Sequence, residues 1–133
     1  MSEPIKQRIL LVEDHADSAN MLTRLLQRNG YEVSATGNVA DALEAAQSEK
    51  NAERPFHLLI SDLGLPDASG FELMRMVREL HQIPGIALSG YGQADDIRRA
   101  MEAGFSHHLT KPIDFEKLKM AIGDSLNQAA PAS

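Results

Sequence analysis

Five short apolar runs alternate along this chain with longer segments of helical periodicity, and this alternation limits the folds open to the chain. The runs are predicted strands at residues 9–12, 31–35, 58–60, 86–88 and 108–110. Strict alternation of strands and helices favours right-handed crossovers and a parallel sheet covered by helices on both faces. The pattern therefore predicts an α/β fold of five strands and five helices.

Capping residues indicate where several of the predicted helices begin and end. The first helix is expected to stop at Asn29–Gly30, and the second to begin near Asn38. Ser69 and Glu72 have the spacing of a capping box at the start of the third helix, and the fifth helix is expected to start at Asp114. These signals support helices between the strands.

Helical periodicity also predicts which side chains face the core. In the fourth helix, Ile97, Ala100 and Met101 are expected to face inward. Met74, Met76 and Met101 are interpreted as core filler, because a flexible thioether side chain packs well into irregular space.

Length and composition exclude several classes of protein. A chain of 133 residues can bury the core of one domain, and the absence of cysteine excludes disulfides and thiolate metal sites. The apolar runs are too short for a membrane span or a signal peptide. A net charge of -6 disfavours direct binding to nucleic acid. The composition predicts a soluble, cytoplasmic protein.

Acidic residues follow two of the predicted strands. Glu13 and Asp14 come after the first strand, and Asp62 closes the third. The carboxyl ends of parallel strands meet at one edge of a sheet, where such folds bind ligands. Three carboxylates in one crevice call for a cation, and oxygen ligands suit Mg²⁺ or Mn²⁺. The alternative is that Glu13 and Asp14 merely begin a helix and that Asp62 merely enters a turn.

A hydroxyl and an amine follow two further strands, since Ser89 comes after the fourth and Lys111 after the fifth. Together with the acids, they suit phosphoryl transfer. A carboxylate oxygen of Asp62 would attack phosphorus in line, while the metal and the Lys111 ammonium offset charge on the transferring oxygens. Ser89 would hydrogen-bond a phosphoryl oxygen. The pattern therefore predicts that Asp62 is a phosphoryl acceptor.

The motifs at residues 9–14, 61–67, 88–90 and 110–112 resemble those of the receiver domains of two-component response regulators. The resemblance covers residues 7–127, with the motifs in the family's order. It implies a flavodoxin-like (βα)5 three-layer sandwich, a parallel sheet of order 2-1-3-4-5, and a crevice between strands 1 and 3. The ends, residues 1–6 and 128–133, are expected to be loosely ordered.

The resemblance also assigns the phosphoryl and metal chemistry to particular residues. Asp62 would be the phosphorylated aspartate, with Mg²⁺ or Mn²⁺ as the cofactor. The metal would be held by Asp62, Asp14, the backbone carbonyl of Gly64, and Glu13 either directly or through water.

The same resemblance identifies a phosphate-binding residue and a conformational switch. Lys111 would pair with the phosphoryl group, Ser89 takes the family's Thr/Ser switch position, and the peptide bond before Pro112 would be cis. His108 stands where the family usually carries Tyr or Phe, so this histidine is the predicted partner in the switch. His107 and His108 should point to opposite faces of the sheet and cannot chelate one metal.

Two further positions are predicted to tune the lifetime of the phosphoryl group. Gly64 and Tyr91 lie two residues beyond Asp62 and Ser89, respectively. At these positions a side chain could obstruct or orient an attacking water.

The implied function is a phosphorelay signalling module that promotes only its own phosphorylation and dephosphorylation. Its partners would be a histidine kinase or histidine phosphotransfer protein and a downstream protein effector, and a homodimer is compatible with the family. Residues 62–70 and 104–114 are also similar to receivers appended to hybrid histidine kinases. No effector is expected after the fifth helix, so the module would act through protein contacts or belong to a longer chain.

Three alternatives are weighed against this function. A haloacid-dehalogenase-like phosphatase needs a second acid two residues after the nucleophile, where this chain has Gly64. A flavodoxin-like cofactor carrier should have a Ser/Thr/Gly-rich phosphate loop where this chain has Glu13 and Asp14. A receiver-like interaction module without phosphotransfer is the third alternative.

Overall fold

The computed structural model describes residues 6–51, 53–90 and 94–129, and its five strands form one parallel sheet. The strand order is β2-β1-β3-β4-β5, which confirms the predicted sheet. The strands are β1 (Arg8–Val12), β2 (Glu32–Thr36), β3 (Leu58–Asp62), β4 (Gly85–Ser89) and β5 (His107–Thr110). Tyr91 and most of the ends predicted to be loosely ordered lie outside the described residues.

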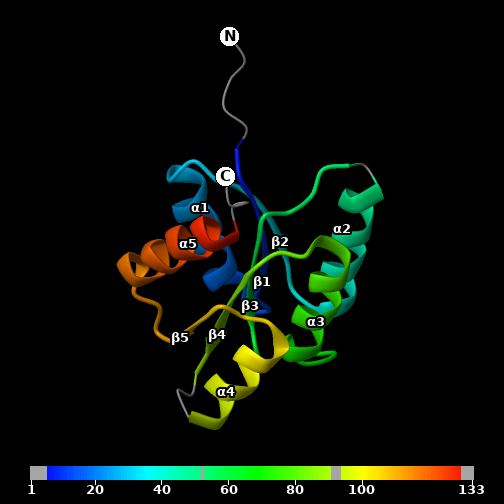
Figure 1. The fold of residues 1–133 in the computed structure, drawn as a ribbon. Coiled ribbons are helices and arrows are strands. Elements are labelled where there is room, and N and C mark those ends of the chain that lie inside the picture. The colour runs from blue at the N-terminus through cyan, green and yellow to red at the C-terminus, as the bar shows by residue number, and fades with distance from the viewer. Residues whose placement is uncertain (1–5, 52, 91–93, 130–133) are drawn as a thin grey trace.

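Five helices cover the two faces of this sheet (Figure 1). The helices α1 and α5 lie on one face, and α2, α3 and α4 lie on the other. Their bounds are α1 (Ala16–Arg28), α2 (Val39–Asn51), α3 (Gly70–His81), α4 (Ala94–Ala103) and α5 (Phe115–Ala129). Residues 128 and 129 were predicted to be loosely ordered, but they form the last two residues of α5. None of the helices in the described ranges has the length and apolarity needed to cross a membrane.

The two central strands are buried on both faces. Every residue of β1 and β3 is buried. Ile9 and Leu11 pack with α1 and α5, whereas Leu10 packs with α2 and α3 on the opposite face. Successive side chains of a strand alternate between its two faces, so a strand covered on both sides needs a continuous apolar run. This burial explains why the runs at residues 9–12 and 58–60 lack polar alternation.

Capping interactions set the helix boundaries at the predicted positions. Gly30 follows α1 with a φ of 91°, a conformation that glycine adopts without steric cost. The Ser69 hydroxyl accepts a hydrogen bond from the Glu72 N–H at 3.3 Å. Asn38 accepts from the backbone N–H of Asp41 at 2.8 Å, just before α2. Local sequence therefore determines where these helices begin or end.

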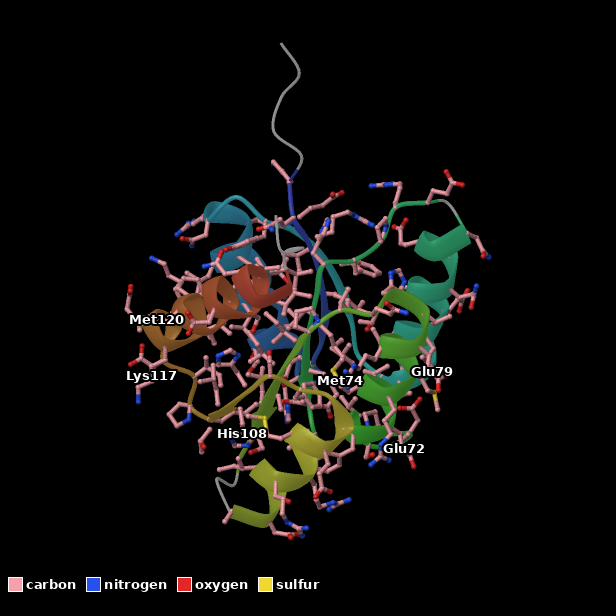
Figure 2. The ribbon with its side chains drawn as sticks, in the orientation of Figure 1. Glu72, Met74, Glu79, His108, Lys117 and Met120 are labelled. Atoms are coloured by element: carbon pink, nitrogen blue, oxygen red, sulfur yellow. The ribbon has the colours of Figure 1, made fainter. Side chains whose placement is uncertain are left out.

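The predicted burial of three side chains is wrong. Ile97, Met101 and Met76 are 36%, 49% and 43% exposed, whereas Met74 is fully buried between α3 and the sheet (Figure 2). In α4 the buried residues are alanines, Ala100 and Ala103. Because small side chains make the contact with the core, the larger apolar side chains lie at the borders of the buried face.

We predict that a β-carbon at position 70 would destabilise the protein. A Cβ on Gly70 would lie 2.2 Å from the Asp62 carbonyl oxygen and 2.9 Å from the Leu63 Cα, so α3 or the end of β3 would have to move. Gly70→Ala should lower the free energy of unfolding by about 1 to 3 kcal/mol, measured by urea denaturation.

Gly64→Ala is the matched control, because a Cβ there would meet nothing within 4 Å. This control should change the free energy of unfolding by less than about 0.5 kcal/mol. Equal stability of the two variants would contradict the close approach of α3 to β3.

Candidate functional site

Side chains from three strand ends meet at the carboxyl edge of the sheet. Glu13 follows β1, Asp62 ends β3 and Lys111 follows β5. The Lys111 Nζ lies 3.0 Å from Glu13 Oε2 and 2.8 Å from Asp62 Oδ1. It donates a hydrogen bond to each carboxylate, at 3.0 Å to Glu13 Oε2 and 3.0 Å to Asp62 Oδ2. The sheet thus brings together residues 49 and 98 positions apart in the sequence.

Burial makes this cluster electrostatically strained. The Glu13 side chain is 0% exposed and that of Asp62 is 6% exposed. Burial and the adjacent Glu13 raise the pKa of Asp62 to about 7, although Lys111 opposes the shift. Burial alone would raise the pKa of Glu13, but hydrogen bonds with Asp62, Lys111 and His15 lower it on balance. Near neutral pH, the two acids therefore tend to share one proton.

The pKa of Lys111 is raised, although burial by itself would lower it. Burial favours the neutral amine, but the hydrogen bonds and charges of Asp62 and Glu13 outweigh it and raise the pKa of Lys111. Lys111 therefore stays protonated and contributes a permanent positive charge to the site.

The donor atoms at this edge fit a divalent cation. Glu13, Asp14, His15 and Asp62 each offer one ligand atom, and these atoms all lie within 4.8 Å of one another. Asp62 Oδ1 is buried and accepts no hydrogen bond among the described residues, because Lys111 is close to it but outside hydrogen-bonding geometry. Fully ionised, three carboxylates exceed the Lys111 ammonium by two charges. A divalent ion would coordinate the oxygen that accepts no hydrogen bond and would balance this excess of negative charge.

The loop after β3 is fixed by a backbone bridge between its two ends and by hydrogen bonds from Asp67 in its middle. Gly64 forms an antiparallel bridge with Ser69. The Asp67 carboxylate accepts hydrogen bonds from the backbone N–H groups of Val39, at 2.8 Å, and Ala40, at 2.9 Å, and these bonds lower the pKa of Asp67. Asp67 thus caps α2 from a distant loop. The sequence alone carries no signal for this contact, because the partners are 28 and 27 positions apart.

Ser89 at the end of β4 and His108 on the neighbouring strand β5 form a hydrogen-bonding pair. The Ser89 Oγ and His108 Nε2 are 2.8 Å apart, and His108 lies on β5 beside α4 (Figure 2). Burial lowers the pKa of His108, although the charge of Asp96 opposes the shift. His107 points to the other face, where its Nδ1 lies 2.9 Å from the Ser125 Oγ. The prediction that the adjacent histidines face opposite ways is confirmed.

Backbone geometry joins the ends of β4 and β5. The Lys111 N–H donates to the Ser89 carbonyl at 2.7 Å, and the Lys111–Pro112 peptide bond is cis. The hydrogen bond fixes the backbone of Lys111 beside the end of β4. Of the site residues predicted from the sequence, Tyr91 is the one that lies outside the described residues.

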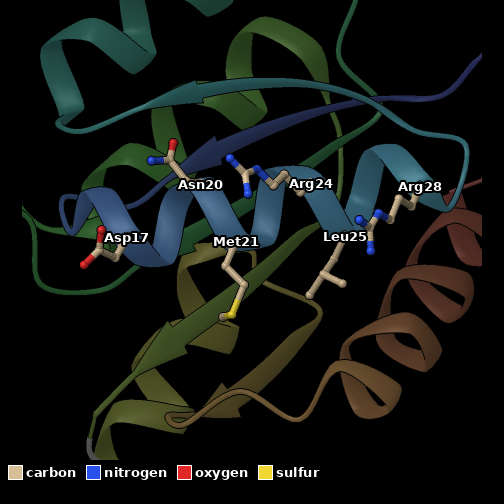
Figure 3. Close-up of a pocket in the computed structure, with 6 residues that line it drawn as sticks. All are labelled: Asp17, Asn20, Met21, Arg24, Leu25 and Arg28. Carbon is tan, nitrogen blue, oxygen red and sulfur yellow. The ribbon is translucent and has the colours of Figure 1, made fainter.

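A hollow on α1 lies apart from these residues. Figure 3 shows its lining, which comes from one helix and combines acidic, basic and apolar side chains. The lining residues are Asp17, Asn20, Met21, Arg24, Leu25 and Arg28. None of them was predicted from the sequence as a site residue.

Comparisons with known proteins agree with this geometry. The family model for the response regulator receiver domain matches residues 9–123. An uncharacterised 14.6 kDa protein of Leptolyngbya boryana is 37% identical over 80% of this chain and 79% of its own length. The two-component response regulator ARR10 of Arabidopsis thaliana is 34% identical over 87% of this chain, which spans only 20% of the regulator.

Solved structures show the same fold. A response regulator receiver domain protein from Clostridium thermocellum superposes with a TM-score of 0.83 at 25% identity, covering 92% of this chain and 95% of its own.

The raised pKa of Asp62 predicts a pH-dependent stability in metal-free buffer. Unfolding returns the carboxyl to its ordinary pKa near 3.8, so the folded state holds the proton more tightly. The free energy of unfolding should therefore fall as pH rises from about 4 to about 7, by at most about 4 kcal/mol.

Asp62→Asn removes this titration. Its stability relative to wild type should increase between about pH 5 and about pH 8, measured by urea denaturation in the presence of a chelator. Added Mg²⁺ should reduce the difference by stabilising ionised Asp62. A constant difference across this pH range would contradict the raised pKa.

Proposed function

Since this chain belongs to the response regulator receiver domain family, we propose that Asp62 accepts a phosphoryl group and that the domain relays a phosphorylation signal. The observation that carries the proposal is the buried Asp62 carboxylate, whose Oδ1 has no hydrogen-bond partner among the described residues while Lys111 Nζ lies 2.8 Å away. An unsatisfied carboxylate oxygen beside a fixed positive charge suits attack on an anionic phosphoryl group.

The transfer would proceed from a phosphohistidine of a histidine kinase or histidine phosphotransfer protein. A carboxylate oxygen of Asp62 forms the new P–O bond, the P–N bond to the donor histidine breaks, and the leaving imidazole keeps the electron pair. The product is an acyl phosphate on Asp62. Lys111 offsets charge on the transferring oxygens. The attack requires ionised Asp62, and a cation at the site favours that form.

The residues that would hold this cation are Glu13, Asp14, Asp62 and the backbone carbonyl of Gly64. When bound, Mg²⁺ or Mn²⁺ would neutralise charge on the phosphoryl oxygens. Asp14 is the most accessible of the three carboxylates, with a side-chain exposure of 35%, so a ligand bound there could retain water molecules on its outer side.

The response to phosphorylation would pass through Ser89. In the present structure its hydroxyl lies against His108 Nε2, so a turn toward a phosphoryl oxygen must break or lengthen this contact. His108 would then be released beside α4. A surface formed by α4 and β5 could in this way report the state of Asp62 to a downstream protein.

The biological setting follows from this chemistry. The domain would act in the cytoplasm and would catalyse no reaction beyond its own phosphorylation and dephosphorylation. It would control a protein partner rather than bind nucleic acid. Gly64 and Tyr91 are proposed to set the lifetime of the acyl phosphate, and a homodimer or a place in a hybrid histidine kinase is compatible with this function.

Asp62→Asn should abolish phosphorylation. Incubation with acetyl phosphate and Mg²⁺ should add the mass of one phosphoryl group to the wild-type protein, read by intact mass spectrometry, and nothing to the variant. Asp17→Asn is the matched control, because Asp17 is an exposed aspartate on α1. A full mass gain in Asp62→Asn would refute the assignment.

The contact between Ser89 and His108 predicts a pH-dependent switch. A protonated imidazole must donate to the Ser89 hydroxyl, and this charge-assisted bond would hold Ser89 away from the phosphoryl group. Because burial lowers the pKa of His108, the ring is neutral above about pH 6.5, its ordinary pKa. Between about pH 5.5 and about pH 8, the active population should therefore rise up to about pH 6.5 and then change little.

His108→Phe should lose this pH dependence. The measurement is the active population of the beryllofluoride-bound protein, followed by NMR across the same pH range. Identical pH profiles for wild type and His108→Phe would show that the imidazole takes no part in the switch.

A further inference from the structure

His15 lies against the acidic cluster although it was not among the residues predicted from the sequence to bind metal. Its Nδ1 is 2.9 Å from Glu13 Oε1 and 3.3 Å from Asp14 Oδ1. Its backbone N–H donates to the same Glu13 oxygen at 3.2 Å. The side chain is 71% exposed, so a hydrated ion could reach it from solvent.

We propose that His15 is a ligand of the metal site and gives this site a preference for divalent transition-metal ions such as Ni²⁺ and Co²⁺ over Mg²⁺. The proposal rests on the metal site of the proposed function and adds to it one ligand and a metal preference. A site with oxygen ligands alone would lack the nitrogen donor and would therefore favour Ni²⁺ and Co²⁺ over Mg²⁺ less strongly.

The spacing of the donor atoms supports this ligand set. Neighbouring ligands of an octahedral ion with bonds of about 2.1 Å lie about 3 Å apart. The distances from His15 Nδ1 to the Glu13 and Asp14 oxygens are close to this value, and Asp62 also falls within the 4.8 Å limit of the group. An ion could therefore enter with small changes in the side chains.

The second observation is a buried carboxylate oxygen on the far side of the cluster, which forms an ion pair with Lys111 at 2.8 Å but accepts no hydrogen bond from the described residues. This oxygen is Asp62 Oδ1, on a side chain that is 6% exposed. It would provide the inner ligand, with His15 on the solvent side. The site is then more than a group of surface acids, because it has a buried donor at one end and an imidazole at the other.

Helix capping does not account for the histidine. His15 occupies the N-cap position of α1 with extended backbone, but its side chain makes no capping hydrogen bond. Ser, Thr, Asp or Asn would stabilise the helix more at this position. The imidazole instead turns toward the carboxylates of Glu13 and Asp14.

The metal preference follows from the chemistry of the donors. Mg²⁺ prefers oxygen ligands and gains little from an imidazole. Imidazole nitrogen suits Ni²⁺, Zn²⁺ and Cu²⁺, and affinity for these ions rises along the first transition series. Adding one nitrogen to a carboxylate cluster should therefore strengthen Ni²⁺ binding far more than Mg²⁺ binding.

Calorimetric titration of the untagged full chain with Ni²⁺ and, separately, with Mg²⁺ tests the proposal. His15→Gln should raise the Kd for Ni²⁺ by at least about 10-fold. Loss of a residue that only hydrogen-bonds to a metal ligand already weakens metal binding by about 10- to 100-fold, and loss of a direct ligand should cost no less. The Kd for Mg²⁺ should change less than about 2-fold. His107→Gln is the matched control, because His107 lies on β5 against Ser125 rather than at the site.

A spectroscopic measurement identifies the ligand directly. The Co²⁺-loaded protein should show a strongly shifted, exchangeable imidazole N–H proton in its NMR spectrum. This signal should be absent from His15→Gln and present in His107→Gln.

The set of outcomes separates failure of the His15 proposal alone from failure of the metal site on which it rests. Unchanged Ni²⁺ affinity in His15→Gln, with Mg²⁺ binding intact, would overturn the role of His15 and leave the phosphoacceptor site standing. Failure of the wild-type protein to bind either ion would overturn both. If Asp62→Asn kept full Ni²⁺ affinity while His15→Gln lost it, the histidine would be an isolated surface ligand and the proposal would also fail.

Discussion

Two buried carboxylates lie against one ammonium group at the carboxyl edge of the sheet, and the rest of the site is arranged around this contact. Glu13 follows β1 and Asp62 ends the neighbouring strand β3, and Lys111 reaches both from the end of β5. Burying the two acids without Lys111 would leave uncompensated negative charge in a low-dielectric environment. Even with Lys111, the pKa of Asp62 remains raised to about 7. The metal-free site therefore holds an unrelieved electrostatic cost that a cation can remove.

Two contacts extend from this centre to opposite sides of the domain. On one side, Ser89 and His108 connect the end of β4 with β5 and the flank of α4. On the other side, Asp67 connects the loop after β3 with the start of α2 through two backbone hydrogen bonds. Asp62 pairs in the sheet with Leu88, the residue before Ser89, and the loop that carries Asp67 follows Asp62 in the chain. The first contact could move with the switch, whereas the second holds the loop that carries Gly64.

His15 gives the site a chemical character that its carboxylates alone would not have. Its side chain is at the solvent side of the cluster, and the buried Asp62 oxygen is at the inner side. The same imidazole has its Nδ1 2.9 Å from Glu13 Oε1, and this hydrogen bond contributes to lowering the pKa of Glu13. One residue at the start of α1 thereby affects both the metal-free state and the choice of ion.

The sequence by itself determined the succession of elements and the residues placed at the strand ends. Hydrophobic periodicity and capping residues act within a few positions, so Ser69, Gly30 and the run at residues 9–12 indicate local structure directly. The resemblance to receiver domains supplied the strand order, which periodicity cannot provide. The same local signals could not show that Ile97 and Met101 are exposed, because burial depends on how closely α4 approaches the sheet.

Only the tertiary structure decided how the site residues act on one another. It placed Lys111 between Glu13 and Asp62, brought Asp67 to α2, and put the His108 imidazole against Ser89. The raised pKa of Asp62 arises from burial and from Glu13, 49 positions earlier in the chain. Burial, hydrogen bonds and charge coupling depend on distances between segments far apart in sequence, and these distances exist only once the sheet has formed.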